Sequence, residues 1–281
     1  MATVLITGAS AGIGRATAVR LAGRGHHVIA TGRNMSALEQ IRRTAKGKVD
    51  TFALDVTSAA SVDSARKEVE AICGQSGLDV LINNAGYTLA GPLESVGDAE
   101  LKAQFETNVF GPLRMVRAFL PGMRTRRHGR IVNISSIVGR LALPFFGPYN
   151  ATKHALEALS DALRNEVRPF GVEVVLIEPG GISTGFSETE RGALEAFGAN
   201  GAYAEHIKKV IAFQKDVGRN AAKPETAARA IVRAVEAKRP RARYVVPFLQ
   251  NRALIALAEF LPTEASDAVI QNITGLRGVR P

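Results

Sequence analysis

The chain has 281 residues, 46% of them hydrophobic and 22% charged, and no apolar run is long enough to span a membrane. A single cysteine, Cys73, excludes an internal disulfide. The net charge of +10 is scattered apart from two dense basic patches, which lack the interleaved aromatic residues that stack on bases. We therefore expect a cytoplasmic protein with no transmembrane segment and no nucleic-acid partner.

A phosphate-binding turn is predicted at the start of the chain. Residues 3–6 read as a short apolar strand, and an amphipathic helix later runs toward Gly25. Between them, Gly8, Gly12 and Gly14 follow the spacing Gly-x-x-x-Gly-x-Gly. A strand, a glycine turn and a helix cradle a pyrophosphate, because glycine permits close approach and the helix N-terminus presents free N–H groups. The pattern indicates a dinucleotide site.

The end of the second predicted strand, residues 27–31, bears on the choice of cofactor. An acidic residue near this position would hold the ribose 2′-hydroxyl of NAD(H), but Gly32 stands there and Arg33 follows. A guanidinium suits a 2′-phosphate because it offers a planar fork of donors, although a solvated arginine at a strand end is also common. The sequence favours NADP(H) over NAD(H).

Strands and helices keep alternating after this point. The apolar pattern predicts strands at 49–54, 80–82, 130–135 and 172–177, and helices at 62–72, 99–117 and 149–168. Six such alternations predict a Rossmann-type, doubly wound parallel α/β sheet with helices on both faces. Ligands bind at the carboxyl ends of the strands in sheets of this kind.

A tyrosine and a lysine lie one helical turn apart just after Pro148. Tyr149 and Lys153 share a helix face, and an ammonium near a phenol favours the phenolate and so aids proton transfer. Ser136 ends the preceding strand and could bond the same oxygen that the phenol protonates. A surface tyrosine with a solvated lysine would also explain so short a motif. Asn108, on an otherwise apolar helix, suits either a structural or a functional amide.

Together these motifs resemble the short-chain dehydrogenase/reductase family, in its order and spacing, over about residues 1–185. The matching residues are Thr7-Gly8-x-x-x-Gly12-Ile13-Gly14, Asn83-Asn84-Ala85-Gly86, Asn108, Ser136, Tyr149-x-x-x-Lys153 and Pro179-Gly180-x-x-x-Thr184. The resemblance implies an NADP(H)-dependent oxidoreductase that interconverts a carbonyl and an alcohol, assembled as a homodimer or homotetramer. Ala11 stands where some NADP-preferring members have a second basic residue, so the choice of cofactor depends mainly on Arg33.

The same resemblance implies a role for each residue. Tyr149 would be the general acid or base, Lys153 would lower its pKa and hold the nicotinamide ribose, and Ser136 would polarise the carbonyl oxygen. Asn108 would hold a water that links Lys153 to a proton relay. The implied cofactor-binding residues are Gly8, Ser10, Gly12, Ile13 and Gly14 at the pyrophosphate, Arg33 at the 2′-phosphate, Asp55 and Val56 at the adenine, Asn83, Ala85 and Gly86 along the cleft, and Pro179, Gly180, Ile182 and Thr184 near the nicotinamide.

Two later segments bear on the substrate. The loop 141–148 and the segment 185–223 carry an apolar wall that predicts a bulky hydrophobic aldehyde or ketone, formed by Leu141, Leu143, Phe145, Phe146, Phe186, Leu194, Phe197 and Tyr203. We expect 185–223 to act as a lid that ligand orders. The alternative function is an NADP(H)-binding sensor or scaffold with little turnover, which has no need of the Tyr149 phenol.

The remaining residues complete one predicted domain, 1–281. The pattern predicts a helix at 224–237, a seventh strand at 243–247 and a C-terminal helical extension at 248–281. The extension resembles tails of the retinol- and hydroxysteroid-dehydrogenase-like branch. We expect it to cover the core, with membrane contact and subunit pairing as the alternatives.

Overall fold

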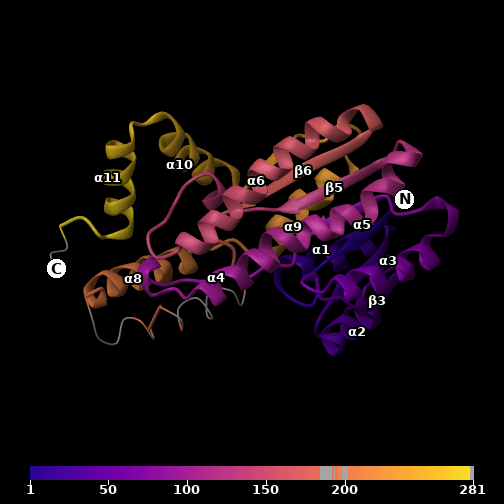
Figure 1. The fold of residues 1–281 in the computed structure, drawn as a ribbon, viewed down its shortest axis with the longest axis horizontal. Helices are drawn as coiled ribbons and strands as arrows, with labels where there is room; N and C mark the ends of the chain where they lie inside the picture. The colour runs from indigo at the N-terminus through magenta and orange to yellow at the C-terminus, as the bar shows by residue number, and fades with distance from the viewer. Residues whose placement is uncertain (184–191, 193, 196, 198–201, 279–281) are drawn as a thin grey trace.

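The computed structural model describes residues 1–183, 192, 194, 195, 197 and 202–278 (Figure 1). Within them, seven strands form one parallel sheet in the order β3-β2-β1-β4-β5-β6-β7. The strands are β1 (Thr3–Ile6), β2 (His27–Gly32), β3 (Val49–Ala53), β4 (Val80–Asn83), β5 (Gly129–Ile134), β6 (Val172–Pro179) and β7 (Arg243–Val246). The predicted Rossmann-type α/β fold is confirmed.

The strand order reverses at β1, which pairs with β2 on one side and β4 on the other. Ligands of open α/β sheets bind outside the carboxyl ends of the strands at such a reversal. Thr7 and Asn84 follow β1 and β4 directly, so their backbones flank this point. The fold therefore directs attention to the two loops that carry the predicted glycine turn and the 83–86 turn.

Helices cover both faces of the sheet. They are α1 (Gly12–Ala22), α2 (Met35–Thr44), α3 (Ala59–Cys73), α4 (Asp98–Phe105), α5 (Gly111–Arg126), α6 (Gly147–Val167), α8 (Ala204–Arg219), α9 (Pro224–Glu236), α10 (Phe248–Phe260) and α11 (Thr263–Thr274). Val4 and Ile6 pack on one face with α1, α2 and α9, whereas Leu5 packs on the other with α3 and α5. Because both faces are buried, the strands are almost continuously apolar.

The predicted helix at 99–117 is two helices joined by a turn of π-helix. Residues Glu106–Phe110 form this turn between α4 and α5, and Pro112 stands at the start of α5. A π turn accommodates one extra residue and redirects the side chains that follow it, and such turns are frequent at functional sites. Asn108 lies at the centre of this turn.

Two helices, α2 and α8, were not predicted. Only Leu38 and Ile41 are buried on α2, and only Ile207 and Val210 on α8, so the apolar pattern of each helix is short. Helix α8 occupies 204–219, inside the segment predicted to be a lid, so that part of the segment has regular structure.

The C-terminal extension forms two helices, α10 and α11, at the end of the molecule that also carries α8 (Figure 1). Ile255 of α10 packs against Val138 and Leu141, and Leu276 packs on the apolar cluster of α8. The extension thus covers apolar side chains of the body. None of the helices in the described ranges is long and apolar enough to cross a membrane.

Candidate active site

The turn between β1 and α1 is built for close backbone approach. Gly8 and Gly12 have φ angles of 64° and 53°, a region that disfavours any side chain. A Cβ atom on Gly14 would lie 2.4 Å from the Gly8 carbonyl oxygen. Asn84 fixes the turn, because its side-chain nitrogen donates to the carbonyls of Thr7 at 3.0 Å and Gly8 at 2.9 Å.

The first turn of α1 suits an anionic group. Ala11 is the N-cap residue, and its methyl side chain cannot accept a hydrogen bond from the helix. The N–H groups of Gly12, Ile13 and Gly14 therefore have no intrahelical acceptor and point out at the positive end of the helix dipole. Together with the missing side chains of the turn, these donors fit the pyrophosphate of a dinucleotide, and Ser10 borders the same turn.

Arg33 and Asp55 lie on the rim beside this turn, after β2 and β3. A Cβ on Gly32 would lie 3.6 Å from the Ser10 hydroxyl, so Gly32 leaves space between β2 and the glycine turn. Asp55 accepts hydrogen bonds from the Thr57 hydroxyl and N–H at 2.7 and 2.9 Å. These bonds lower the pKa of Asp55, and the nearby charge of Arg33 adds to the effect. Arg33 is exposed, and its guanidinium lies near enough to Asp55 for its charge to act on that carboxyl.

Val56 is buried, whereas the preceding residue, Asp55, is partly exposed. Its side chain belongs to the core cluster that α3 and α5 form, and a Cβ on Gly111 would lie only 2.7 Å from one of its methyl groups. The Val56 side chain is thus a core contact, and only the Val56 backbone remains beside Asp55 to border a cofactor.

Lys153 lies on α6 and reaches across to the end of β5. Its ammonium donates to the Ile134 carbonyl at 2.8 Å and lies 5.6 Å from the centroid of the Tyr149 ring. Burial lowers the pKa of Lys153 to about 8, and the charge of Glu157 opposes this effect. A lysine in this state loses its positive charge at mildly alkaline pH.

Ser136 follows β5 and faces β6. Its hydroxyl donates to the Pro179 carbonyl at 3.2 Å and accepts from the N–H of Val138 at 3.3 Å. Tyr149 packs against the cluster that contains Val138. A hydroxyl, a phenol and an ammonium therefore gather where β5, β6 and α6 meet. Such a set can donate hydrogen bonds and a proton to an oxygen that gains negative charge.

The Asn108 side chain makes three hydrogen bonds with the protein. Its amide nitrogen donates to the Tyr87 carbonyl at 2.8 Å and the Thr152 hydroxyl at 3.2 Å, and its oxygen accepts from the Tyr87 N–H at 3.1 Å. A Cβ on Gly86 would lie 3.1 Å from that oxygen. The amide thus ties the loop after β4 to α6, next to Lys153.

The other predicted residues have different surroundings. Asn83 ends β4 and turns into the sheet, where its amide donates to the Asn133 oxygen at 2.9 Å. Ala85 lies against the glycine turn, since a Cβ on Gly8 would be 2.8 Å from the Ala85 Cα. Asn84, which holds the turn, was not singled out from the sequence, although it stands in the same motif.

The last group follows β6. Gly180 packs closely on Asn251 of α10, whose side-chain nitrogen would lie 2.3 Å from a Cβ on Gly180. Ile182 is buried and forms an isolated bridge with Ala222. Thr184 lies outside the described residues.

Most of the predicted apolar wall comes together in one cluster. Tyr203 stacks edge-on against Phe145 at 5.8 Å between ring centroids, and the buried members of the cluster are Ala90, Phe146, Leu194, Ile207 and Val210. Leu143 and Phe197 also pack on this cluster, and Leu141 packs in the neighbouring cluster with Ile255. Phe186 lies outside the described residues.

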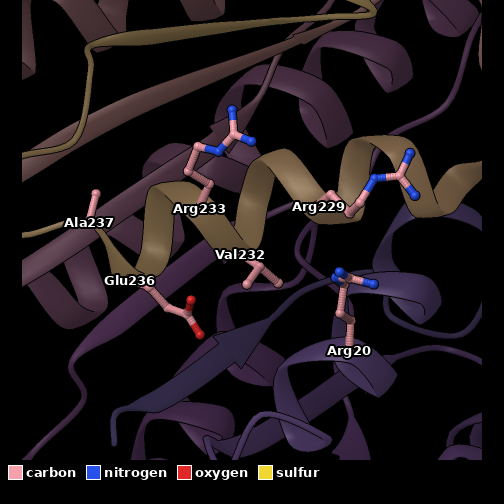
Figure 2. Close-up of a pocket in the computed structure, with 6 residues that line it drawn as sticks. All are labelled: Arg20, Arg229, Val232, Arg233, Glu236 and Ala237. Carbon is pink, nitrogen blue, oxygen red and sulfur yellow. The ribbon is translucent and has the colours of Figure 1, made fainter.

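A surface pocket of about 410 Å³ lies elsewhere, between α1 and α9 (Figure 2). It is lined by Arg20, Arg229, Val232, Arg233, Glu236 and Ala237. Its residues come from the last turns of α1 and the later turns of α9, which end where the next strands begin, so the pocket lies at the amino ends of the strands. Figure 2 shows that its arginine side chains do not converge on one point. The pocket is separate from the site at the carboxyl ends.

Comparison with known proteins gives similarity over most of the chain. A family model described as short chain dehydrogenase matches residues 2–195. The chain is 42% identical over 238 residues to the 3-ketodihydrosphingosine reductase of Bacteroides thetaiotaomicron, covering 84% of each protein. It is 33% identical over 250 residues to the NADPH-dependent 3-dehydrocapnine reductase of Ornithobacterium rhinotracheale, covering 88% of each protein.

Solved structures resemble this chain along most of its length. A short chain dehydrogenase/reductase from Burkholderia phymatum in complex with NAD has a TM-score of 0.77 at 27% identity, with 91% of this chain and 92% of that chain covered. An alcohol dehydrogenase from Thermococcus sibiricus complexed with 5-hydroxy-NADP has a TM-score of 0.70 at 26% identity, with 88% and 96% covered.

Proposed function

We propose that this chain, which belongs to the short-chain dehydrogenase/reductase family, uses NADP(H) to interconvert a bulky hydrophobic ketone or aldehyde with its alcohol. One observation carries the proposal. Tyr149 and Lys153 share a face of α6, and the Lys153 ammonium reaches the end of β5, two residues before Ser136. A pure binding protein has no use for a phenol placed beside a buried ammonium.

The residues divide the proton chemistry among them. The bound nicotinamide supplies the hydride when a carbonyl is reduced. Ser136 donates a hydrogen bond to the carbonyl oxygen, and Tyr149 gives that oxygen its proton as negative charge develops there. Lys153 favours proton release by its positive charge and holds the nicotinamide ribose, while Asn108 orders the water that returns a proton. In alcohol oxidation the phenolate accepts the proton instead.

A nicotinamide dinucleotide fits the glycine turn and matches the cofactors of the two solved relatives. We propose NADP(H) because Arg33 is exposed on the rim beside Asp55, with Gly32 in place of an acid. The relative from Ornithobacterium is named as NADPH-dependent, which supports the same choice. In this proposal the pyrophosphate lies on Gly8, Ser10, Gly12, Ile13 and Gly14, and the adenine lies by Asp55 and Val56.

The proposed substrate class rests on the apolar cluster around Phe145 and Tyr203. Phe145, Phe146 and Tyr203 belong to it, and their aromatic rings suit an apolar substrate. We propose that Asn83, Ala85, Gly86, Pro179, Gly180, Ile182 and Thr184 border the cofactor, and that the 185–223 segment closes over the substrate. The names of the two reductase relatives supply the first ketones to test, 3-ketodihydrosphingosine and 3-dehydrocapnine.

The test is a panel of hydrophobic and small polar carbonyls assayed by NADPH and NADH absorbance. We expect turnover of the hydrophobic ketones with NADPH, and a loss of about 10²–10⁴-fold in kcat for Tyr149→Phe with cofactor binding retained. Tyr244→Phe, remote on β7, is the matched control and should keep its activity. Full activity of Tyr149→Phe would contradict the catalytic role. Tight NADPH binding without turnover of any carbonyl would favour the sensor or scaffold function.

A cytoplasmic location and a homodimer or homotetramer complete the proposal. Family membership favours an oligomer, and sedimentation velocity of the purified chain will give its mass directly. Fractionation of the cells that express it will test the location.

A further inference from the structure

A second set of charged side chains lies behind Lys153. Glu157 follows Lys153 by one turn of α6, and only 5% of Glu157 and 7% of Lys153 are exposed. Gly139 closes this space, because a Cβ there would lie 3.0 Å from the Glu157 Cγ, 3.0 Å from the Ser135 hydroxyl and 3.1 Å from the Lys153 carbonyl. Lys153 and Glu157 are therefore both buried, one turn apart on the same face of α6.

Arg243 of β7 joins Glu157 to a second buried acid. Its Nε lies 3.1 Å from a Glu157 oxygen and 3.0 Å from a Glu178 oxygen, and its terminal nitrogen lies 2.5 Å from Asp161. Arg140 lies 3.5 Å from Glu178 and also pairs with Glu259 of α10. The charges that face Glu157 thus come from α6, β6, β7 and the loop after β5.

The cations and carboxyl groups of this cluster are equal in number. Four cations meet four carboxyl groups: Lys153, Arg140, Arg164 and Arg243 against Glu157, Glu178, Asp161 and Glu259, with Arg164 2.7 Å from Asp161. Glu178 is fully buried, and burial and the charge of Glu157 raise its pKa to about 7. One oxygen of Glu178 and one of Glu157 have no hydrogen-bond partner among the described residues, and the other oxygen of each faces Arg243. Burial raises the pKa of Glu157 as well, but the Ser135 hydroxyl, Arg243 and Arg140 oppose that rise and favour its charged form.

We propose that Glu157 is a positioning residue, the buried counter-ion that keeps the Lys153 side chain charged beside Tyr149. The role deepens the proposed function and rests on it. Within the described residues, Glu157 is the acidic group whose charge acts on Lys153, and the Ile134 carbonyl holds the other side of the ammonium. Arg243 fixes the Glu157 carboxyl from behind, so Glu157 acts through Lys153 without touching substrate.

The first test measures the titration midpoint of Lys153 in the protein without cofactor. Trace acetic anhydride labels only neutral amines, so the labelling of Lys153, measured by mass spectrometry across pH, reports the midpoint of its titration. We expect a midpoint near 8 in the parent and about one unit lower in Glu157→Gln, because a charge is removed from a poorly screened site. Glu157→Asp keeps the charge and should restore most of the shift. Asp161→Asn, one turn further along α6 and bonded to the same arginine, should leave the midpoint unchanged.

The second test measures how the kcat of the enzyme depends on pH. The alkaline limb of the kcat profile for carbonyl reduction should move down by about one unit in Glu157→Gln, with the substrate KM unchanged. A purely structural role would lower kcat at every pH and leave the limb in place, which would overturn the proposal. An unchanged Lys153 midpoint in Glu157→Gln would also overturn it. Loss of turnover in the parent with the labelling shift intact would instead contradict the proposed function alone.

Discussion

Gly14 approaches Gly8 so closely that a methyl group on Gly14 would lie 2.4 Å from the Gly8 carbonyl oxygen. The same oxygen accepts the Asn84 amide at 2.9 Å. Helix α1, strand β1 and the loop after β4 thus meet at one carbonyl with no room for another heavy atom. The turn proposed to hold the cofactor is therefore also a packing contact of the fold.

Gly14→Ala should destabilise the chain even without cofactor. The added methyl group must displace backbone atoms, so we expect a loss of about 2–3 kcal/mol in the free energy of unfolding and a weaker affinity for NADPH. Gly218→Ala in α8 is the matched control, because a Cβ there meets nothing within 4 Å. Alanine favours a helix over glycine by about 1 kcal/mol, so the control should be neutral or stabilising in urea unfolding. Equal stability of Gly14→Ala and the parent would contradict the contact.

Gly32→Asp should turn cofactor preference toward NADH. Gly32 has an unstrained backbone, and the nearest atom to a new Cβ is the Ser10 hydroxyl at 3.6 Å, so a Cβ makes only ordinary contacts there. A carboxylate there would accept from a ribose 2′-hydroxyl and repel a 2′-phosphate. We expect the ratio of kcat/KM for NADPH over NADH to fall at least 100-fold, and Arg33→Ala alone to lower it less. A ratio that both substitutions leave unchanged would contradict the proposed role of Arg33.

The alkaline activity should follow the charge of Lys153. Burial lowers the pKa of this lysine to about 8, so its positive charge is present below that pH and lost above it. The kcat/KM for carbonyl reduction should therefore fall as the pH rises through about 8. Lys153→Arg keeps a charge at every pH in this range, and its residual activity should lack that step. A parent profile that stays flat to pH 9.5 would contradict the assignment.

The parts of the fold that local pattern determines were predictable. Buried parallel strands are short apolar runs, and the glycine spacing after β1 carries its own geometry, so the sheet and the turn followed from the sequence. Helix α8 was not predicted, because only Ile207 and Val210 are buried on it and its apolar pattern is short. The π turn at Asn108 was not predicted. The Asn108 amide donates to Tyr87 and Thr152, and the sequence gives no sign that these residues lie near it.

The charged cluster behind Lys153 could be predicted from the sequence only in part. Glu157 and Lys153 are four residues apart and could be paired from helical spacing alone. Glu178 and Arg243 come from two other strands, and the register of β6 with β7 brings them together. No local pattern marks a glutamate in an apolar strand as a proton-holding group, because its pKa depends on burial by the rest of the fold.

Glu178→Gln should remove a pH dependence of stability. Burial raises the pKa of Glu178 to about 7 in the folded chain, against 4.5 for an ordinary glutamate. Between these values the folded chain holds a proton that the unfolded chain has released, so the contribution of Glu178 to stability falls as the pH rises from about 4.5 to 7. An amide resembles the protonated carboxyl and does not titrate. Relative to the parent, Glu178→Gln should gain about 2 kcal/mol in the free energy of unfolding between pH 5 and pH 8.

Urea unfolding at the two pH values measures this difference, and the other titrating groups cancel between the two proteins. Glu173→Gln is the matched control, because Glu173 lies on the same strand but is partly exposed and pairs with Arg130. It should keep the parental difference between pH 5 and pH 8. If Glu178→Gln kept that difference as well, the carboxyl would already be ionised at pH 5, which would contradict the raised pKa of Glu178.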